Sequence, residues 1–303
     1  MKILVTGAAG FVGSHICRDL LARGHEVRAA DRPGCSLTRL SDLADRVELH
    51  EVDIFQADEK ALQELAGGIG LCIHAAWNVT PGVYLQSTDN LACLSGTLRL
   101  FEQAWKAGVP RIAGLGTCFE YRMQPTPLQE SSPVAPQTLY AAAKLSTLCT
   151  GGQLAHVLGG SLVWPRLFYM YGPHENASRL VPDLIANLLA GQRVPLTEGH
   201  QVRDFLHVAD AASGIVAAAL SDLEGAVNVC SGSAIQVRDL ATQLGTVLGR
   251  SDLLGFGERA PNLQDPPAVV GDPDRLRSVT GWRPTRTMPE GLQQTVAWWK
   301  ARV

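Results

Sequence analysis

The first half of the chain alternates short apolar runs with longer segments in which apolar residues recur every three or four positions. The apolar runs predict strands over residues 2–6, 25–31, 71–76 and 110–116. The segments between them predict helices over residues 11–23, 58–66, 96–108 and 139–159. Strands that alternate with helices at this spacing form βαβ units with right-handed crossovers. We therefore expect an α/β fold with a doubly wound parallel sheet, which binds ligands at the carboxyl ends of its strands.

The pattern changes near residue 166. Residues 172–204 hold several prolines, among them Pro182, and residues 256–274 are rich in Pro, Gly and Asp, which are loop-forming compositions. Between them, residues 205–232 return to the apolar pattern of a helix and a strand. This predicts a main domain of residues 1–166 plus about 205–232, and a smaller C-terminal lobe of about 167–204 plus 233–303.

Composition and charge exclude several classes of protein. The 303 residues carry 18% charged side chains, a formal net charge of −3 and no Lys/Arg-rich tract, so nucleic acid is not an expected partner. Seven dispersed cysteines without a C-x-x-C pair argue against a zinc site or a disulfide framework, and they fit a reducing cytoplasm. No apolar window is long enough to span a membrane, and the N-terminus runs straight into a strand. We expect a cytoplasmic protein without a metal or a membrane partner.

The turn VTGAAGFVG joins the first predicted strand to the first helix. Gly7, Gly10 and Gly13 suit a tight turn, close approach of the backbone to a pyrophosphate, and close packing of helix on strand. A plain strand–helix turn is the alternative. Asp31 ends the second strand, where a carboxylate accepts hydrogen bonds from the adenosine ribose of a dinucleotide, and this context favours dinucleotide binding.

The choice of cofactor depends on Asp31 and its neighbours. Asp31 repels a 2′-phosphate and so favours NAD, whereas the Arg32 guanidinium would hold that phosphate of NADP unless it is a solvated loop residue. Asp53 follows the next strand and either reaches the adenine amino group or caps a turn. The residues expected to contact the cofactor are Gly7, Gly10, Phe11, Val12, Gly13, Asp31, Arg32, Asp53, Ile54, Ala75, Ala76, Tyr140 and Lys144.

Tyr140 and Lys144 lie four residues apart in the helical segment LYAAAKLS. This spacing places both side chains on one face of the helix, and the alanines between them leave room for a flat ligand. A phenol with its usual pKa near 10 transfers protons poorly at neutral pH unless a cation such as the Lys144 ammonium favours the phenolate. On its own, this spacing occurs often by chance, and an ordinary exposed Tyr and Lys is the simpler interpretation.

These features belong to a longer series of motifs, which resembles the extended short-chain dehydrogenase/reductase family of nucleotide-sugar epimerases, dehydratases and reductases. The motifs are TGAAGFVGSH, Asp31, VDI, HAAW, GTLRLFEQA, GTCFEY, YAAAK, RLFYMYGP, RDFLHVAD, NVCSG and GWRPTRTMPEGLQQTVAWW, in the family's order. The resemblance implies a Rossmann domain that binds NAD, with NADP as the alternative, and a C-terminal lobe that holds a nucleoside diphosphate sugar. It also implies a homodimer that pairs the helices around 97–107 and 138–158. Leu98, Phe101 and Trp105 either contribute to that interface or face the sheet.

By the same resemblance, Tyr140 is the catalytic acid–base and Lys144 holds the nicotinamide ribose and lowers the pKa of the tyrosine. Thr117 matches the residue that hydrogen-bonds the reacting sugar oxygen. The residues expected to contact the sugar nucleotide are Trp77, Thr117, Cys118, Phe119, Tyr169, Arg203 and Arg259. Trp77 is equally well a core residue.

Arg203 and Arg259 match positions that contact the substrate phosphates, because a guanidinium offers a fork of donors to a pyrophosphate. For Arg203 the alternative is a structural ion pair with Asp204 or Asp210. Tyr169 and Cys93 stand where the family often has an Asn, so the identity of the sugar stays open.

The two residues that follow Thr117 differ from those of the family's 4,6-dehydratases, in which an Asp–Glu pair at these positions eliminates water. Here these positions hold Cys118 and Phe119, and an extended backbone would turn Glu120 away from the face of Thr117. Dehydration is therefore not expected. His174 fits the histidine position of epimerase–reductases of the GDP-fucose synthase type, although a plain polar loop residue is the simpler interpretation.

Together these residues predict a reductase, in which NAD(P)H gives a hydride to C4 of a 4-keto(-6-deoxy) nucleotide sugar while Tyr140 protonates the oxygen. The alternative is a nucleotide-sugar 4-epimerase with retained NAD, which uses the same residues. A third interpretation, from another class, is a non-catalytic module that senses NAD(P). The presence of Thr117, Tyr140 and Lys144 together argues against that module.

Overall fold

The computed structural model describes residues 1–262 and 265–302. Its main sheet has eight strands, which run parallel in the order β11-β7-β5-β4-β1-β2-β3, with the short β6 paired to β7. These strands are β1 (Lys2–Thr6), β2 (Glu26–Asp31), β3 (Glu48–Glu51), β4 (Leu71–His74), β5 (Arg111–Gly114), β6 (Gly116–Thr117), β7 (Ser161–Leu167) and β11 (Gly225–Val229). The predicted α/β fold with a doubly wound parallel sheet is confirmed.

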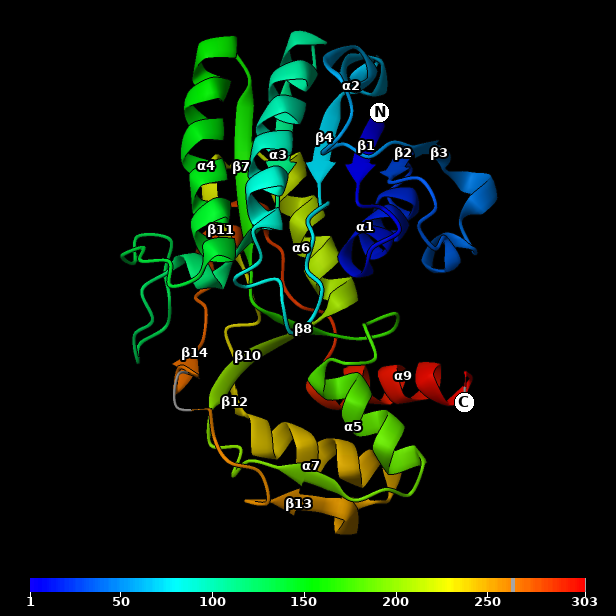
Figure 1. The fold of residues 1–303 in the computed structure, drawn as a ribbon, viewed down its shortest axis with the longest axis vertical. Helices are drawn as coiled ribbons and strands as arrows, with labels where there is room; N and C mark the ends of the chain where they lie inside the picture. The colour runs from blue at the N-terminus through cyan, green and yellow to red at the C-terminus, as the bar shows by residue number, and fades with distance from the viewer. Residues whose placement is uncertain (263–264, 303) are drawn as a thin grey trace.

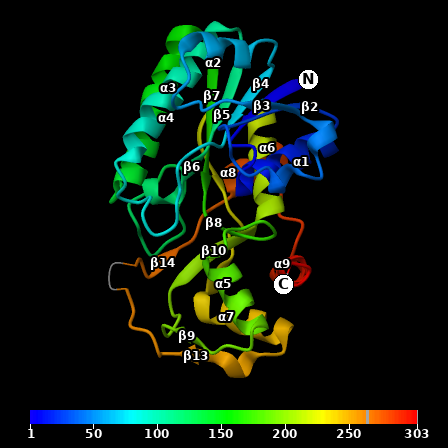
Figure 2. The ribbon, with the colours of Figure 1, turned by 45° about the vertical axis from the view of Figure 1, so that its right-hand side comes forward.

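Helices cover both faces of this sheet (Figures 1 and 2). One face carries α1 (Phe11–Ala22) and α6 (Val208–Leu220), and the other carries α2 (Glu59–Ala66), α3 (Asp89–Lys106) and α4 (Leu139–Leu158). Because side chains alternate along a strand, Ile3 and Val5 of β1 join the core on the α1 side, and Leu4 joins the core on the opposite side.

The helix α3 begins at Asp89, seven residues before the predicted start at 96. No side-chain hydrogen bond caps it, so its start carries no clear capping signal. Phe101 and Trp105 on α3 are only 0% and 6% exposed, and they pack in the core beneath the helix. Phe101 and Trp105 therefore pack against the sheet and are not available to a dimer interface.

The smaller lobe lies below the carboxyl ends of the main strands in the view of Figure 1. Its core is built by α5, α7 and α9 around a sheet of order β12-β10-β14, to which β8 adds, and β9 and β13 form a separate pair. The bounds are β8 (Tyr169–Tyr171), α5 (Leu180–Leu189), β9 (Val194–Leu196), β10 (Val202–His207), β12 (Ala234–Gln236), α7 (Val237–Leu248), β13 (Leu254–Phe256), β14 (Ala268–Val269), α8 (Asp274–Thr280) and α9 (Met288–Lys300). The helix α8 contacts α6 and β11 of the main sheet. The division into two domains at the expected boundaries stays a prediction.

The expectation of loops over residues 172–204 is wrong for part of this range, because α5 (Leu180–Leu189), β9 (Val194–Leu196) and the start of β10 (Val202–His207) form there. Pro182 is the third residue of this helix, where the missing N–H would have no partner within the helix. A proline in this position starts a helix rather than ending one. None of the helices in the described parts of the chain has the length and apolar character needed to cross a membrane.

Candidate active site

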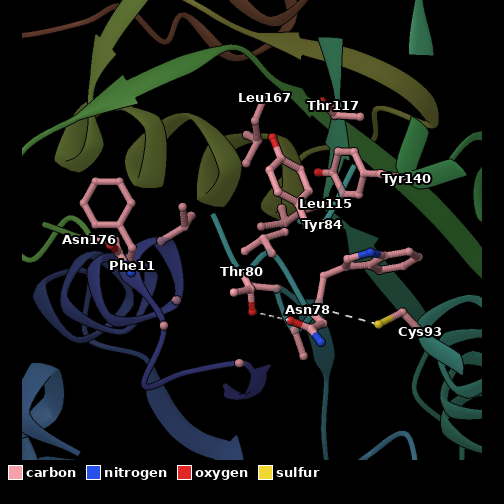
Figure 3. A pocket seen from close by; sticks show the side chains of 18 of the residues that line it. Phe11, Asn78, Thr80, Tyr84, Cys93, Leu115, Thr117, Tyr140, Leu167 and Asn176 are labelled. Carbon is pink, nitrogen blue, oxygen red and sulfur yellow. Dashed lines mark hydrogen bonds between the residues drawn. The ribbon is translucent and has the colours of Figure 1, made fainter. Parts of the chain in front are cut away.

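A cavity of about 1010 Å³ opens at the carboxyl ends of the main strands, between the sheet and the first turn of α5 (Figure 3). This edge of a doubly wound sheet is where such folds bind ligands, since the connections leave in opposite directions on either side of β1. The cavity is lined by every residue expected to contact the cofactor. It is also lined by all the residues expected to contact the sugar nucleotide except Arg203 and Arg259.

The glycine turn leaves no space for side chains. Gly7 has a φ of +68°, and a Cβ there would lie 2.6 Å from the backbone N of Ala76. A Cβ on Gly13 would lie 2.0 Å from the carbonyl O of Gly7. The helix α1 begins at Phe11 without a side-chain cap, so its first N–H groups are available to an anion in the cavity. This cradle fits the pyrophosphate of a dinucleotide.

Asp31 lies at the end of β2 on the wall of the cavity. Its two carboxylate oxygens accept hydrogen bonds from the backbone N of Ala9 and of Arg32, both at 2.9 Å. Each oxygen retains lone-pair capacity for a ribose hydroxyl. Asp53 accepts from the backbone N of Phe55 at 3.0 Å, so it caps its own turn while it lines the cavity.

Thr117 and Tyr140 lie beside each other in the cavity (Figure 3). Thr117 ends β6, and Tyr140 lies in the first turn of α4, whose start Thr138 caps by accepting from the backbone N of Ala141 at 3.1 Å. Burial raises the pKa of Tyr140 above its usual value, and the neighbouring Tyr84 and Glu120 add to this, while a hydrogen bond with Thr117 opposes it. The phenol is therefore neutral in the free chain.

Lys144 lies one turn further along α4 and is 4% exposed. Its Nζ donates to the carbonyl O of Leu115 at 2.8 Å and stands 3.7 Å from the centroid of the Trp77 ring. It lies 6.0 Å from the centroid of the Tyr140 ring. Burial lowers the pKa of Lys144 to about 7, an effect that Glu120 and Cys93 oppose.

Residues Cys118–Glu120 form a 3₁₀ turn, not the extended segment expected. Glu120 nevertheless points away from the cavity, as expected, and it is fully buried. Its carboxylate accepts from the backbone N of Thr117 at 2.9 Å, from Trp164 Nε1 at 2.9 Å and from Arg166 Nε at 2.7 Å. Glu120 therefore holds Thr117 from behind and is not available to substrate.

Cys118 and Cys93 both line the cavity. Burial raises the pKa of Cys118 to about 12, so its thiol stays protonated at neutral pH. Burial also raises the pKa of Cys93, whose Sγ accepts from the backbone N of Asn78 at 3.5 Å. Neither thiol is poised as a proton donor to a leaving group or as a nucleophile.

Three aromatic rings form one wall of the cavity next to Thr117. The Phe119 and Tyr169 centroids are 6.3 Å apart, and those of Tyr169 and Phe205 are 5.7 Å apart. Behind this wall, the guanidinium of Arg203 lies 5.3 Å from the Tyr169 ring. The wall offers a predominantly apolar surface to a ligand.

Arg203 is 2% exposed and forms a salt bridge with Asp265 at 2.5 Å. This partner differs from the two aspartates considered from the sequence. Arg259 is exposed, and its backbone N donates to the carbonyl O of Leu196. Contact of either arginine with substrate phosphates stays a prediction.

His174 lies on a loop between the two lobes with a left-handed φ of +70°. Its ring contacts those of His15 and Trp298, with centroids 5.9 Å and 4.7 Å apart, and it does not line the cavity. Burial lowers the pKa of His174 to about 4. This placement supports the simpler interpretation of His174 as a loop residue.

Sequence reasoning missed several residues that line the site, among them Phe205, Tyr84 and Arg179. The ring of Tyr84 packs edge-on against Tyr140 with centroids 4.9 Å apart, and the Arg179 guanidinium lies 5.4 Å from the Tyr84 ring. Arg179 is the N-cap of α5, which has no side-chain cap, and its side chain lines the cavity. A cation just ahead of the apolar run LVPDLIANLL, which was not predicted to be a helix, is the signal that would have marked Arg179.

Comparison with known proteins gives a consistent result. The model of the NAD dependent epimerase/dehydratase family matches residues 3–230. A UDP-glucose 4-epimerase of Mycolicibacterium smegmatis is 30% identical, with 99% of each chain covered. A dTDP-glucose 4,6-dehydratase of Streptomyces niveus is 28% identical, with 99% of this chain and 93% of the relative covered. The crystal structure of a dTDP-glucose 4,6-dehydratase of Streptomyces venezuelae with NAD bound has a TM-score of 0.90 at 26% identity, with 99% of this chain and 97% of that chain covered.

Proposed function

Because the chain belongs to the NAD-dependent epimerase/dehydratase family, its cofactor is NAD, and we propose that it oxidises and reduces C4 of the hexose of a nucleoside diphosphate sugar. The family and the cofactor inferred from the motifs are thereby confirmed. The observation that carries the proposal is the adjacent pair of hydroxyl groups on Thr117 and Tyr140 (Figure 3). Lys144, one helical turn after Tyr140 on α4, lines the same cavity.

The residues of this site suit proton transfer at an alcohol oxygen. NAD, when bound, takes up and returns a hydride at carbon. Tyr140 Oη removes the proton of the C4 hydroxyl and later returns it, and Thr117 Oγ1 holds the same oxygen by a hydrogen bond. Burial favours the neutral phenol of Tyr140. The Lys144 ammonium, 6.0 Å from the centroid of the Tyr140 ring, would favour the phenolate that Tyr140 must become.

The site gives no support to water elimination. The two positions after Thr117 hold a thiol that burial keeps protonated and a phenyl ring, and the carboxylate of Glu120 is occupied by Arg166, Trp164 and the backbone. Elimination needs an acid that protonates the leaving hydroxyl and a base that removes a proton from carbon. We therefore propose that the protein does not dehydrate its substrate, although relatives named dehydratases are similar over the full length.

We propose 4-epimerisation as the reaction. A relative named UDP-glucose 4-epimerase is 30% identical over 99% of both chains, and one acid–base set serves both halves of an epimerisation. Reduction of a 4-keto-6-deoxy nucleotide sugar, the first expectation from the sequence, is the second candidate. The aromatic wall of Phe119, Tyr169 and Phe205 favours it, because an apolar surface accepts a methyl group at C6 better than a hydroxyl.

One experiment distinguishes these reactions. The purified protein is loaded with NAD and given UDP-glucose, dTDP-glucose or a 4-keto-6-deoxy nucleotide sugar, while NADH absorbance and products are followed. Interconversion of the C4 epimers without net NADH change supports the epimerase, and stoichiometric loss of added NADH with the ketone supports the reductase. A 4-keto-6-deoxy product from dTDP-glucose would contradict the exclusion of dehydration.

The variant Tyr140→Phe tests the mechanism in the same assay. It should lower kcat by roughly 10²- to 10⁴-fold, the usual contribution of a positioned acid–base, and leave NAD binding intact. Full activity of this variant would contradict the role of Tyr140. NAD binding without turnover of any substrate by the unaltered protein would support the sensing module instead.

We also propose that the protein is a homodimer formed through α3 and α4. These helices lie side by side, and they expose Leu91 (55%) and Val157 (76%), with Leu98 partly exposed between polar positions. Gel filtration at assay concentration should give a mass near twice 32.4 kDa. A monomer at that concentration would contradict the dimer.

A further inference from the structure

Trp77 follows the strand β4 and covers Lys144, which gives it a different task from the substrate contact expected from the sequence. We propose that Trp77 is a positioning residue, whose indole face holds the Lys144 ammonium in the place where it acts on Tyr140. This inference deepens the proposed function and rests on the role of Lys144 in it.

The contact between the two side chains is close. Lys144 Nζ lies 3.7 Å from the Trp77 ring centroid, well inside the range of a cation–π contact. An ammonium has three N–H donors, and the carbonyl O of Leu115 accepts one of them at 2.8 Å. The Trp77 indole and the Leu115 carbonyl therefore hold the ammonium from two sides. Its remaining N–H donors are left to face the cavity.

The indole is itself held in place by a buried asparagine. Trp77 Nε1 donates to Asn90 Oδ1 at 2.8 Å, and Asn90 is 1% exposed. Asn90 Nδ2 donates to the carbonyl O of Tyr84 at 2.7 Å and to that of Ser87 at 2.8 Å. Both polar atoms of the Asn90 side chain therefore take part in hydrogen bonds that connect the Trp77 indole to residues 84 and 87.

The segment 77–90 also contacts Tyr140. The Tyr84 ring packs against that of Tyr140 with centroids 4.9 Å apart, and the backbone N of Tyr140 donates to the carbonyl O of Leu85 at 3.0 Å. The Trp77 and Tyr140 rings are also in edge contact, with centroids 6.3 Å apart. Residues 77–90 thus connect Lys144 to Tyr140 on the side opposite to α4.

No carboxylate neutralises Lys144 within the described residues. Glu120, on the turn packed against α4, is paired with Arg166, and Cys93, on α3, has a pKa that burial raises. His74, on β4, has a pKa that burial lowers to about 3, and it is therefore uncharged. Of the aromatic rings around this ammonium, that of Trp77 lies nearest, at 3.7 Å against 5.8 Å for Trp164. The Trp77 indole, the Leu115 carbonyl and the charge of Glu120 thus compensate the burial of Lys144 together.

Lysine-selective NMR of the free protein tests the proposal directly. The chain has five lysines, Lys2, Lys60, Lys106, Lys144 and Lys300, so ¹³Cε-labelled lysine gives a spectrum in which Lys144 can be assigned with Lys144→Arg. We expect the Hε signals of Lys144 to be shifted upfield by the indole ring current. In Trp77→Leu this shift should disappear, and the pKa of Lys144 should fall by about one pH unit, because a contact that favours the charged form is lost while burial remains.

Two further variants make the test specific. Trp77→Phe keeps an aromatic face and should retain part of the ring-current shift and of the pKa, and it covers the case in which Trp77→Leu does not fold. The matched control is Trp298→Leu, which removes an indole that lies 3.8 Å from the guanidinium carbon of Arg302, outside the cavity. This control should leave the Lys144 signals unchanged.

The outcomes separate this inference from the proposed function. An unshifted Lys144 signal in the unaltered protein, or the same Lys144 pKa in folded Trp77→Leu, would overturn the positioning role whatever reaction the protein catalyses. In the activity assay, Trp77→Leu should lower kcat severalfold and change the KM for the nucleotide sugar little. A rise in KM with kcat unchanged would instead assign Trp77 to substrate contact.

Discussion

At the scale of single residues, a buried carboxylate supports Thr117, which we propose to hold the reacting oxygen. Glu120 is fully buried and accepts from Arg166 Nε at 2.7 Å. In Glu120→Gln the Arg166 guanidinium loses its counter-charge in a buried site, so the free energy of unfolding should fall by about 3 kcal/mol. Urea denaturation of the unliganded protein measures this loss.

The matched control for this change is Glu102→Gln, which breaks the exposed pair between Glu102 and Lys106 on α3. It should leave the denaturation midpoint within experimental error, because exposed ion pairs contribute little. Equal midpoints for Glu120→Gln and the unaltered protein would show that Glu120 does not stabilise the site.

The residues of the proposed acid–base set, which line one cavity, could be proposed from the sequence because their signals are local. These signals are the four-residue spacing of Tyr140 and Lys144, and Thr117 at the end of a strand. The task of Glu120 could not be predicted in the same way. Its partner Arg166 lies 46 residues away, and only the pairing of β6 with β7 brings the two together. Arg203 shows the same limit, since its partner is Asp265 and not a residue near it in the chain.

At the scale of elements, the N-terminus of α5 is the site that the sequence least suggested. Arg179 precedes the helix, no side chain caps it, and Leu180 and Val181 line the cavity with the guanidinium. Open N–H groups, the positive end of the helix dipole and a cation together suit the diphosphate of a nucleotide sugar. Arg179→Ala should therefore raise the KM for the nucleotide sugar about tenfold or more, through loss of a charge-assisted contact.

The affinity for NAD should not change in this variant, since the expected pyrophosphate site of NAD is at α1. Titration of both ligands by calorimetry measures the two effects separately. The control is Arg238→Ala, on α7, whose side chain pairs with Glu198 away from the cavity. Weaker binding of NAD together with an unaltered KM would place the sugar diphosphate elsewhere.

Several strands of the main sheet were predicted, among them β1, β2, β4 and β5, whereas β7 and the strands of the smaller lobe were not. Strands such as β4 are buried along their whole length and read as continuous apolar runs. In contrast, β8, β12 and β14 contain only two or three residues each, too few to show a period. They form because β10 offers partners on both of its edges, which is a property of the tertiary structure.

At the scale of the whole molecule, the smaller lobe lies beyond the carboxyl edge of the main sheet (Figure 2). Residues of the sheet, of its connections and of the smaller lobe line one cavity. The main sheet supplies the expected cofactor contacts, and the smaller lobe supplies Phe205 and the first turn of α5. The order of the motifs along the chain does not predict that residues of the smaller lobe line the cavity. This arrangement depends on β8 and β10, which lie outside the main sheet and beyond its carboxyl edge.

The stability of the whole chain should depend on pH through its buried histidines. His74 is 1% exposed, contacts the hydroxyls of Thr6 and Thr97 at 2.8 Å and 3.0 Å, and burial lowers its pKa to about 3. Burial lowers the pKa of His15 to about 3 and that of His207 to about 4 in the same way. Between pH 6.5 and 4 the unfolded chain binds protons at these positions and the folded chain does not, so the free energy of unfolding falls as the pH falls.

For one such histidine the slope approaches about 1.4 kcal/mol per pH unit between its unfolded and folded pKa values. Urea denaturation at pH 7.5, 6 and 5 should show a declining stability, and His74→Asn should decline less steeply, because the substituted side chain does not titrate. The control His200→Asn changes an exposed histidine and should keep the slope of the unaltered protein. If His74→Asn declines as steeply as the unaltered protein, His74 takes up its proton in the folded state, and the acid sensitivity must come from other groups.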